Sequence, residues 1–316
     1  MKREKISKIN VNAKGMQVII LGAGAIGSLF GAKLSKINDV TLIARKEHAD
    51  KISKNGLAVA GLEKKVYKLK AAENIKEIKK DTLIILSTKV HDSQSAIRHI
   101  KKFLRKDTII LCLQNGLYSE NIVKKIVGNK CTVLRAITNF GAIYLNPGSV
   151  NYTNYSYTAI EKNPRSMKIA RNFSECGLNG YAAKDIRNEM WKKLVFNCIV
   201  NPLTAILRIE NMHVTDDKLN PLKKLIADEC KAVAEKDGIK LEIDFVRATN
   251  EEFRNSRNIS SMQQDLLKGK KTEIDFLNGG VARLGKKYGI KCPVNDAIAA
   301  IIKEMERYNH NKKLLI

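Results

Sequence analysis

The sequence predicts an α/β protein in which a helix-covered parallel sheet is followed by a mostly α-helical domain. Five short apolar segments, separated by helix-length segments, indicate buried strands of a parallel sheet. They read MQVIIL, VTLIA, TLIILST, TIILCL and CTVLRAI. Beyond residue 183 the strand signals end and helix start and stop signals take over. We therefore expect a flexible basic extension over 1–15, a sheet domain over 16–183 and a helical domain over 184–316.

The composition narrows the class of protein. Of the 316 residues, 44% are hydrophobic, which is enough for one or two domains with real cores. The histidines lack metal-ligand spacing, and no apolar run approaches the roughly 18 residues of a membrane span. We therefore expect no metal and no membrane insertion. The six cysteines lie far apart in apolar surroundings, as reduced thiols do, so we expect a cytoplasmic location. They are Cys112, Cys131, Cys176, Cys198, Cys230 and Cys292.

The net charge of +25 raises the question of a nucleic-acid partner. The extension carries five basic residues and one acidic residue, so +21 remains on the folded part. These lysines are scattered, and aromatic residues are only 6%, with no basic and aromatic stripe on which bases could stack. The pattern favours a solvated lysine-rich surface, whose positive field would concentrate small anionic substrates. The oligomeric state stays open, a homodimer included.

The glycines of LGAGAIG come directly after the first predicted strand and open a helix. Gly22, Gly24 and Gly27 have the G-x-G-x-x-G spacing, with Ala25 and Ile26 inside the same turn. Such a turn lets a pyrophosphate approach the backbone and meet the helix N-terminus. In this strand-turn-helix context the spacing predicts a Rossmann-type dinucleotide site, and the alternative is a glycine-rich packing turn.

The residues after the next strands suggest how the dinucleotide is held. Arg45 and Lys46 stand where an NAD enzyme usually has an acidic residue. A cation there suits a 2′-phosphate and favours NADPH, although both side chains could simply be exposed at a helix start, with Glu47 nearby. Lys89 and Asn115 follow the third and fourth strands, so we expect them at the carboxyl edge of the sheet, in the cleft.

The segment EMWKKLVFNCIVNPLTAI has a polar stripe in an apolar helix. Lys193, Asn197 and Asn201 lie four residues apart and share one helix face. Buried polar groups need partners, which either other protein groups or a ligand must provide. If the stripe faces the cleft, burial should lower the pKa of Lys193 toward the working range of a proton donor, while Glu273 would restrain that drop.

Other signals lie in the second half. Asn220 and Pro221 open a helix that closes at Gly238; a second helix is expected over Lys271–Tyr288, and a third from Asn295. Earlier in the chain, VNYTNYSYTAI reads as later, partly antiparallel strands. The remaining polar candidates also have structural alternatives. Ser261 with Gln264 fits a helix N-cap, and Glu273 or Asp275 fits a first-turn carboxylate.

Together these motifs resemble the ketopantoate reductase (2-dehydropantoate 2-reductase) family over residues 16–307. The resemblance is carried by LGAGAIGSLFGAKL, STKV, LQNG, NPGSV, MWKKLVFNCIVNPLTAI and NISSMQQDLLKGKKTEIDFLNGG, in the family's order. It implies a Rossmann domain followed by a helical domain similar to that of 6-phosphogluconate dehydrogenase. It also implies reduction of 2-dehydropantoate by NADPH to (R)-pantoate, for pantothenate and coenzyme A biosynthesis. The alternatives are another branched 2-oxo acid as substrate, or a non-catalytic dinucleotide-binding or nucleic-acid-associated protein.

The resemblance also implies roles for single residues. On the substrate side, Lys193 matches the general acid, Asn197, Asn201 and Ser261 match contacts to the substrate's hydroxyl and carboxylate, and Asn211 matches a further substrate position.

On the cofactor side, Asn115 matches an asparagine near the nicotinamide, Lys89 a cleft lysine and Ala142 a backbone contact. Glu273 matches an acid that touches the ribose and orders the site, and Arg45 the reader of the 2′-phosphate. One departure is Arg135 in VLRAIT, where the family commonly has a small residue.

Overall fold

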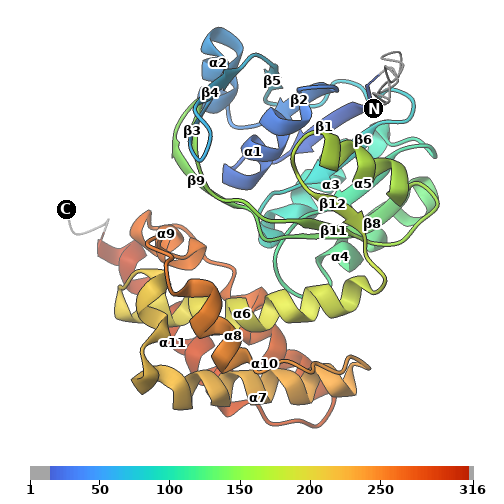
Figure 1. The fold of residues 1–316 in the computed structure, drawn as a ribbon. Helices are drawn as coiled ribbons and strands as arrows, with labels where there is room; N and C mark the ends of the chain where they lie inside the picture. Colours follow the sequence, from blue (N-terminus) through green and yellow to red (C-terminus); the bar gives the residue numbers. More distant parts are fainter. Residues whose placement is uncertain (1–14, 313–316) are drawn as a thin grey trace, which may run out of the picture.

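The computed structural model describes residues 15–312, and its first domain is built on a mostly parallel sheet (Figure 1). The five predicted parallel strands are confirmed, each within two residues of the expected bounds. They are β1 (Gln17–Leu21), β2 (Asp39–Ile43), β6 (Leu83–Leu86), β7 (Ile109–Cys112) and β8 (Thr132–Thr138). Three short strands extend the sheet to the order β12-β11-β8-β7-β6-β1-β2-β5. They are β5 (Lys70–Ala72), β11 (Thr158–Ile160), which is antiparallel to β8, and β12 (Gly180–Ala182).

Helices cover both faces of this sheet, as predicted. On one face, Phe30 and Phe173 of α1 and α5 join the buried core. On the other face, Ile97 and Val123 of α3 and α4 do the same. The helices are α1 (Ala25–Leu34), α2 (Lys46–Asn55), α3 (Ser93–Ile100), α4 (Ser119–Val127) and α5 (Ser166–Glu175).

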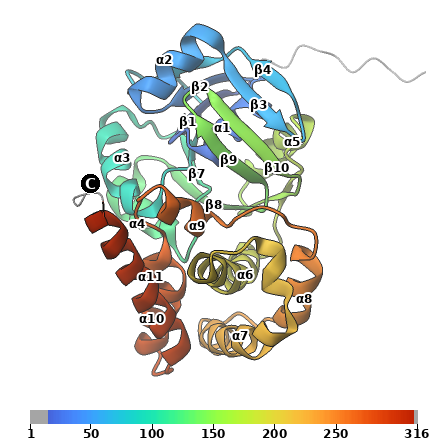
Figure 2. The ribbon, with the colours of Figure 1, turned by 90° about the vertical axis from the view of Figure 1, so that its left-hand side faces the viewer.

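A second, four-stranded sheet in the order β4-β3-β10-β9 was not predicted. It packs over α1, so that this helix is enclosed between the two sheets (Figure 2). This explains why α1 is buried over Gly27–Leu34, Lys33 included. Its strands are β3 (Leu57–Gly61), β4 (Lys65–Tyr67), β9 (Gly141–Asn146) and β10 (Ser149–Asn154). The antiparallel pairing of β10 with β9 and of β11 with β8 confirms the expectation of partly antiparallel later strands.

The second domain is helical, as predicted, and its first helix begins at Ile186, where Asp185 accepts hydrogen bonds from two first-turn N–H groups. Its helices are α6 (Ile186–Leu207), α7 (Asn220–Lys236), α8 (Phe245–Phe253), α9 (Ser261–Leu267), α10 (Asn278–Lys287) and α11 (Pro293–Lys312). Short 3-10 turns fill the connections. They are Val90–Asp92, Lys101–Phe103, Gly128–Lys130, Asn211–Thr215, Asp217–Leu219 and Ile274–Phe276. None of the helices described is long and apolar enough to cross a membrane.

Two predicted helix bounds are wrong. The expected helix over Lys271–Tyr288 begins only at Asn278, because Leu277 leaves the helical conformation with φ −102° and ψ −110° and separates a 3-10 turn from α10. The helix expected from Asn295 begins at Pro293, a residue whose missing N–H costs nothing in a first turn.

The helix α6 contains a proline in its interior. Pro202 has no N–H to offer the carbonyl four residues earlier, that of Cys198. The side chain of Asn278, fully buried at the start of α10, donates to this carbonyl at 3.0 Å. A side chain of α10 therefore replaces the backbone hydrogen bond that Pro202 removes from α6, and this bond also links the two helices.

Candidate active site

The glycine turn lies between β1 and α1. Gly22 has φ +100°, and a Cβ there would lie 2.6 Å from the backbone nitrogen of Thr88. At Gly27 a Cβ would lie 2.5 Å from the carbonyl oxygen of Gly22. A Cβ at Gly24, in contrast, would meet nothing within 4 Å. The turn is therefore packed tightly on its protein side and open on the other, beside the first-turn N–H groups of α1, which include those of Ala25 and Ile26. These features fit a dinucleotide pyrophosphate.

The carboxyl ends of the parallel strands lie along one edge of the sheet, where open α/β sheets bind ligands. Arg45 follows β2 there, directly before α2, and its side chain is exposed. Lys89 follows β6 and Asn115 follows β7. Ala142 lies in β9, just beyond the end of β8. The expected position of Lys89 and Asn115 after consecutive strands is confirmed, and these two residues join a common network of contacts.

That network is centred on Glu273, which is 6% exposed. Its carboxylate accepts hydrogen bonds from Asn115 Nδ2 at 3.2 Å and from the backbone nitrogen of Val90 at 3.3 Å. Lys89 Nζ lies 3.9 Å from the same carboxylate and 2.5 Å from Asp265 Oδ2. Two acids of the helical domain therefore bind the ends of two strands of the sheet domain.

The charges in this network shift the pKa values of Lys89 and Asp265. Burial alone would lower the pKa of Lys89, but the negative charges of Glu273 and Asp265 outweigh it and hold that pKa above its ordinary value. Burial raises the pKa of Asp265, against the pull of Lys89. Lys89 is thus held in its charged form at the edge of the sheet, between two carboxylates of the helical domain.

Lys193 reaches the same edge from α6. Its ammonium donates a hydrogen bond to the carbonyl oxygen of Thr138, the last residue of β8. Burial, with help from the charge of Arg135, lowers the pKa of Lys193 to about 8, and Glu273 opposes the shift. The direction of the shift and the opposition by Glu273 agree with the sequence-based expectation. The amine is therefore a group that can release a proton near neutral pH.

The two asparagines of the stripe differ in burial, Asn201 being buried and Asn197 partly exposed. Asn211 lies in the 3-10 turn Asn211–Thr215, where its Nδ2 donates to Ser256 Oγ at 3.4 Å. Its Oδ1 is buried and has no partner within the described residues. An unpaired buried oxygen costs about 1–3 kcal/mol, so a ligand that donates a hydrogen bond would be stabilised there.

The expected N-cap at Ser261 is wrong by one residue. Ser260 caps α9, with extended backbone angles and an Oγ that accepts from Gln263 N at 3.2 Å. The same Oγ receives a hydrogen bond from Thr204 Oγ1 at 2.8 Å, which anchors α9 on α6. Ser261 is the first residue of α9 and is exposed. Its substrate role stays a prediction.

Three residues of the site were missed as functional candidates. Asp265 had no sequence signal beyond its place one turn after Ser261 on α9. Thr138 acts through its backbone carbonyl, which no side-chain pattern reveals. Arg135 was noticed only as a departure from the family.

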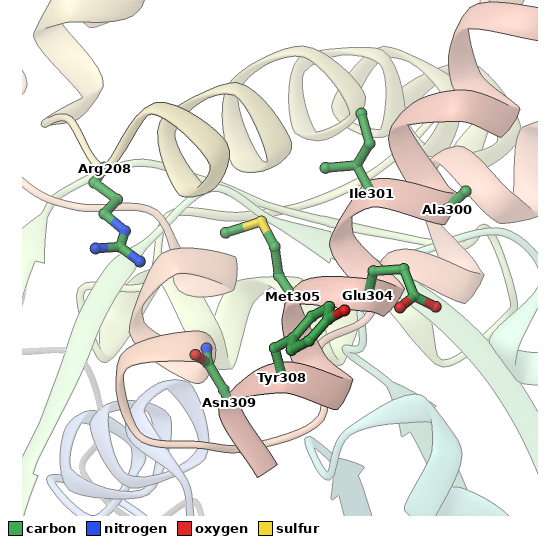
Figure 3. Close-up of a pocket in the computed structure, with 7 residues that line it drawn as sticks. All are labelled: Arg208, Ala300, Ile301, Glu304, Met305, Tyr308 and Asn309. Carbon is green, nitrogen blue, oxygen red and sulfur yellow. The ribbon is translucent and has the colours of Figure 1, made fainter. Parts of the chain in front are cut away.

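One cavity is lined by other residues. It has a volume of about 470 Å³ and is lined by Arg208 at the end of α6 and by side chains of α11 such as Met305 and Tyr308 (Figure 3). None of the predicted site residues lines it. Within residues 15–312, no group of three or more His, Cys, Asp or Glu side chains could hold a metal ion.

Comparison with known proteins bears on both domains. Residues 18–165 match the family model "Ketopantoate reductase PanE/ApbA", and residues 185–306 match "Ketopantoate reductase PanE/ApbA C terminal". The chain belongs to the ketopantoate reductase family. The fold, a parallel-sheet domain followed by a helical domain, is the one that the family's structures have.

Similar proteins span nearly the whole chain. A 2-dehydropantoate 2-reductase of Pyrococcus horikoshii is 34% identical, covering 94% of this chain and 100% of that protein. One of Archaeoglobus fulgidus is 32% identical, covering 92% and 98%. Among solved structures, a PanE/ApbA family ketopantoate reductase from Ralstonia eutropha has a TM-score of 0.86 at 30% identity, covering 93% and 99%. D-mandelate dehydrogenase with NADH and anilino(oxo)acetate has a TM-score of 0.85 at 29% identity, with the same coverage.

Proposed function

We propose that this protein is an NADPH-dependent 2-dehydropantoate 2-reductase that forms (R)-pantoate, a step of pantothenate and coenzyme A biosynthesis. The observation that carries the proposal is the position of Lys193, an amine of lowered pKa at the carboxyl edge of the sheet, beside the Glu273 network. The named relatives at up to 34% identity over nearly the full chain support the same substrate. They also support a nicotinamide cofactor, as does the open glycine turn.

Reduction of a ketone needs a hydride at carbon and a proton at oxygen. When bound, the reduced nicotinamide supplies the hydride. Lys193 supplies the proton, because an ammonium with a pKa of about 8 is charged at neutral pH and gives up its proton readily. Glu273 restrains that pKa and, with Lys89, orders the sheet edge against which the reaction takes place.

The remaining polar residues bind the substrate in this proposal. Asn197 and Asn201 follow Lys193 on the same face of α6 and can hold a hydroxyl or carboxylate without adding charge. Asn211 offers its unpaired Oδ1 to a substrate hydroxyl, and Ser261 offers an exposed hydroxyl. Together they suit a small anionic 2-oxo acid that also carries a hydroxyl.

The cofactor is NADPH in this proposal because Arg45 is exposed directly after β2, where a 2′-phosphate would lie. Ala142 and Asn115 then complete the cofactor side. The NADH in the D-mandelate dehydrogenase complex is the reason to test both cofactors. We also infer a cytoplasmic location, because all six cysteines are free thiols.

A second candidate keeps the chemistry and changes the substrate. The likeness to D-mandelate dehydrogenase, at a TM-score of 0.85, favours reduction of another 2-oxo acid. The two candidates are separated by a panel of 2-oxo acids that contains ketopantoate, with oxidation of NADPH and of NADH followed by absorbance. Ketopantoate with NADPH should give the highest kcat/KM. A higher value for a different acid would refute the narrower proposal and leave the reductase chemistry in place.

The role of Lys193 has its own test. Lys193→Ala should lower kcat by about 10²- to 10⁴-fold, as loss of a general acid does. The matched control is Lys192→Ala, because Lys192 is the residue before Lys193 on α6 and, among the described residues, forms an ion pair with Glu189 alone, at 3.6 Å. Turnover like that of the wild type in Lys193→Ala would contradict the mechanism.

A further inference from the structure

Arg135 is an ionised side chain in the interior of the first domain. It lies on β8, between β7 and β11, and is 2% exposed. A buried charge is costly unless hydrogen bonds and an opposite charge satisfy it. The hydrogen bonds of Arg135 have no part in the proposed mechanism, so the acceptors that they reach are informative.

The guanidinium forms hydrogen bonds to the turn that carries Asn115. Its Nη2 donates to the carbonyl oxygen of Gln114 at 2.6 Å and to that of Gly116 at 2.9 Å, the two residues on either side of Asn115. Its Nη1 donates to Ser119 Oγ and lies 3.3 Å from Glu120 Oε2 at the start of α4. The Arg135 guanidinium therefore contacts four acceptors within residues 114–120 and holds this turn on the side of β8.

The front of the same turn meets the helical domain. Asn115 donates to Glu273, and the backbone nitrogen of Leu117 donates to the carbonyl oxygen of Phe276 at 3.4 Å. Gly116 has φ +83°, and a Cβ there would lie 2.7 Å from that same oxygen. The turn is therefore packed between Arg135 and the segment that carries Glu273, and its shape decides whether Asn115 reaches the carboxylate.

Arg135 also acts on Lys193 by charge. Both are tied to β8, Arg135 as a member of the strand and Lys193 through the carbonyl of Thr138, three residues further on. Among the described residues, the charges that shift the pKa of Lys193 are that of Arg135, which lowers it, and that of Glu273, which raises it.

Three other acidic groups lie close to this pair. Glu120 of α4 pairs with the Arg135 guanidinium, and Glu161, after β11, accepts from the Arg135 backbone nitrogen at 2.7 Å. On α6, Glu189 lies one turn before Lys193 and is engaged with Lys192 and with Tyr157. Glu120 and Glu161 therefore partly balance the positive charge of Arg135. The residues of β8 between Arg135 and Thr138 include no acid.

We propose that Arg135 is a positioning residue of the active site, holding the Gln114–Gly116 turn so that Asn115 meets Glu273 and favouring proton release from Lys193 through its fixed charge. This inference rests on the proposed role of Lys193 as proton donor. It goes beyond that role because it assigns part of the site's acidity and part of its shape to a residue that is itself buried in the sheet domain.

Two variants separate the charge from the grip. Arg135→Lys keeps the charge and loses the two-pronged contact, whereas Arg135→Met loses both. The pKa of Lys193 is read on the full-length protein without substrate, by competitive acetylation with acetic anhydride across pH and mass spectrometry of the peptide. The Kd for NADPH is read by fluorescence titration. Arg171→Met is the matched control, because Arg171 is an exposed arginine of α5 that pairs only with Glu175.

We expect the acetylation midpoint of Lys193 to rise by about half a unit to one unit in Arg135→Met, and to stay in place in Arg135→Lys and in the control. The Kd for NADPH should rise about 3- to 30-fold in both Arg135 variants, because both loosen the turn. An unchanged midpoint in Arg135→Met overturns the charge effect, and an unchanged Kd in both variants overturns the grip.

If Arg135→Met does not fold, Glu120→Gln gives the same test with the opposite sign. Removal of this negative charge leaves the charge of Arg135 less balanced, so the midpoint of Lys193 should fall, and a midpoint that stays or rises overturns the inference. The acetylation readout needs no substrate. A failed ketopantoate assay with a shifted midpoint therefore refutes the substrate proposal alone, whereas normal turnover with an unshifted midpoint refutes the inference alone.

Discussion

Replacement of Lys193 by methionine should abolish proton donation and yet make the protein more stable at neutral pH. The pKa of Lys193 falls from 10.5 to about 8, a difference of about 2.5 units. Since one pKa unit corresponds to about 1.36 kcal/mol, the folded protein carries a penalty on the order of 3 kcal/mol for keeping this ammonium charged. The lost hydrogen bond to Thr138 offsets about 1.5–3 kcal/mol of that. Lys193→Met should therefore gain about 1 kcal/mol in the free energy of unfolding.

The pH dependence of this gain has a definite sign. Below about pH 8 the amine is charged in both the folded and the unfolded protein, so the wild type bears the whole penalty. As the pH rises from about 8 to 10.5, the folded protein releases the proton first and the penalty disappears. The advantage of Lys193→Met should therefore be largest near neutral pH and vanish at alkaline pH.

The assay is urea unfolding of the wild type, Lys193→Met and the control Lys192→Met, at about pH 7 and about pH 10. Far-UV circular dichroism reports both domains, and the fluorescence of Trp191, the only tryptophan, reports the helix that carries the lysine. A variant that is less stable than the wild type by the same amount at both pH values would refute the claim that burial of a charge sets the pKa of Lys193.

Three further outcomes are expected. Glu273→Gln should lower the pKa of Lys89 and reduce kcat/KM about 10- to 100-fold, because Lys89 loses one of its two opposite charges; unchanged kinetics would contradict the network. Arg45→Gln should raise the KM for NADPH about 10-fold or more and leave that for NADH unchanged, and equal effects on both would argue against a 2′-phosphate contact. His48 accepts from Gly148 N at 2.8 Å and burial lowers its pKa below 6.5, so its stabilisation holds above about pH 6.5 and is lost below it. In His48→Gln the unfolding free energy should fall less steeply below that pH, and an equal slope would refute the assignment.

The parallel sheet could be predicted because its strands are buried on both faces and read as unbroken apolar runs, as LIIL in β6 and IILC in β7 do. The second sheet has no such signal. Its strand β3, LAVAG, is short and small, and its strand β9 is mostly half-exposed. What specifies it is the apolar surface of α1, which must be covered on the side away from the first sheet. That requirement is tertiary and has no local period.

The site shows the same division. The sequence placed Lys89 and Asn115 at strand ends, because strand direction alone determines which edge they occupy. It could not reveal that Glu273 of the other domain receives the hydrogen bond of Asn115, since 158 residues separate the two. Ser260, the residue that caps α9, also bonds to Thr204, which is 56 residues away in the sequence.

The proline in α6 makes this helix depend on the side chain of Asn278. With alanine at position 202, the backbone N–H of that alanine would bond to the carbonyl of residue 198, and the Asn278 side chain would not be needed for that bond. In this chain, loss of Asn278 alone leaves a buried oxygen without a donor. Loss of the Asn278 amide should therefore destabilise the helix bearing the proton donor more than it would in a protein with an N–H at position 202.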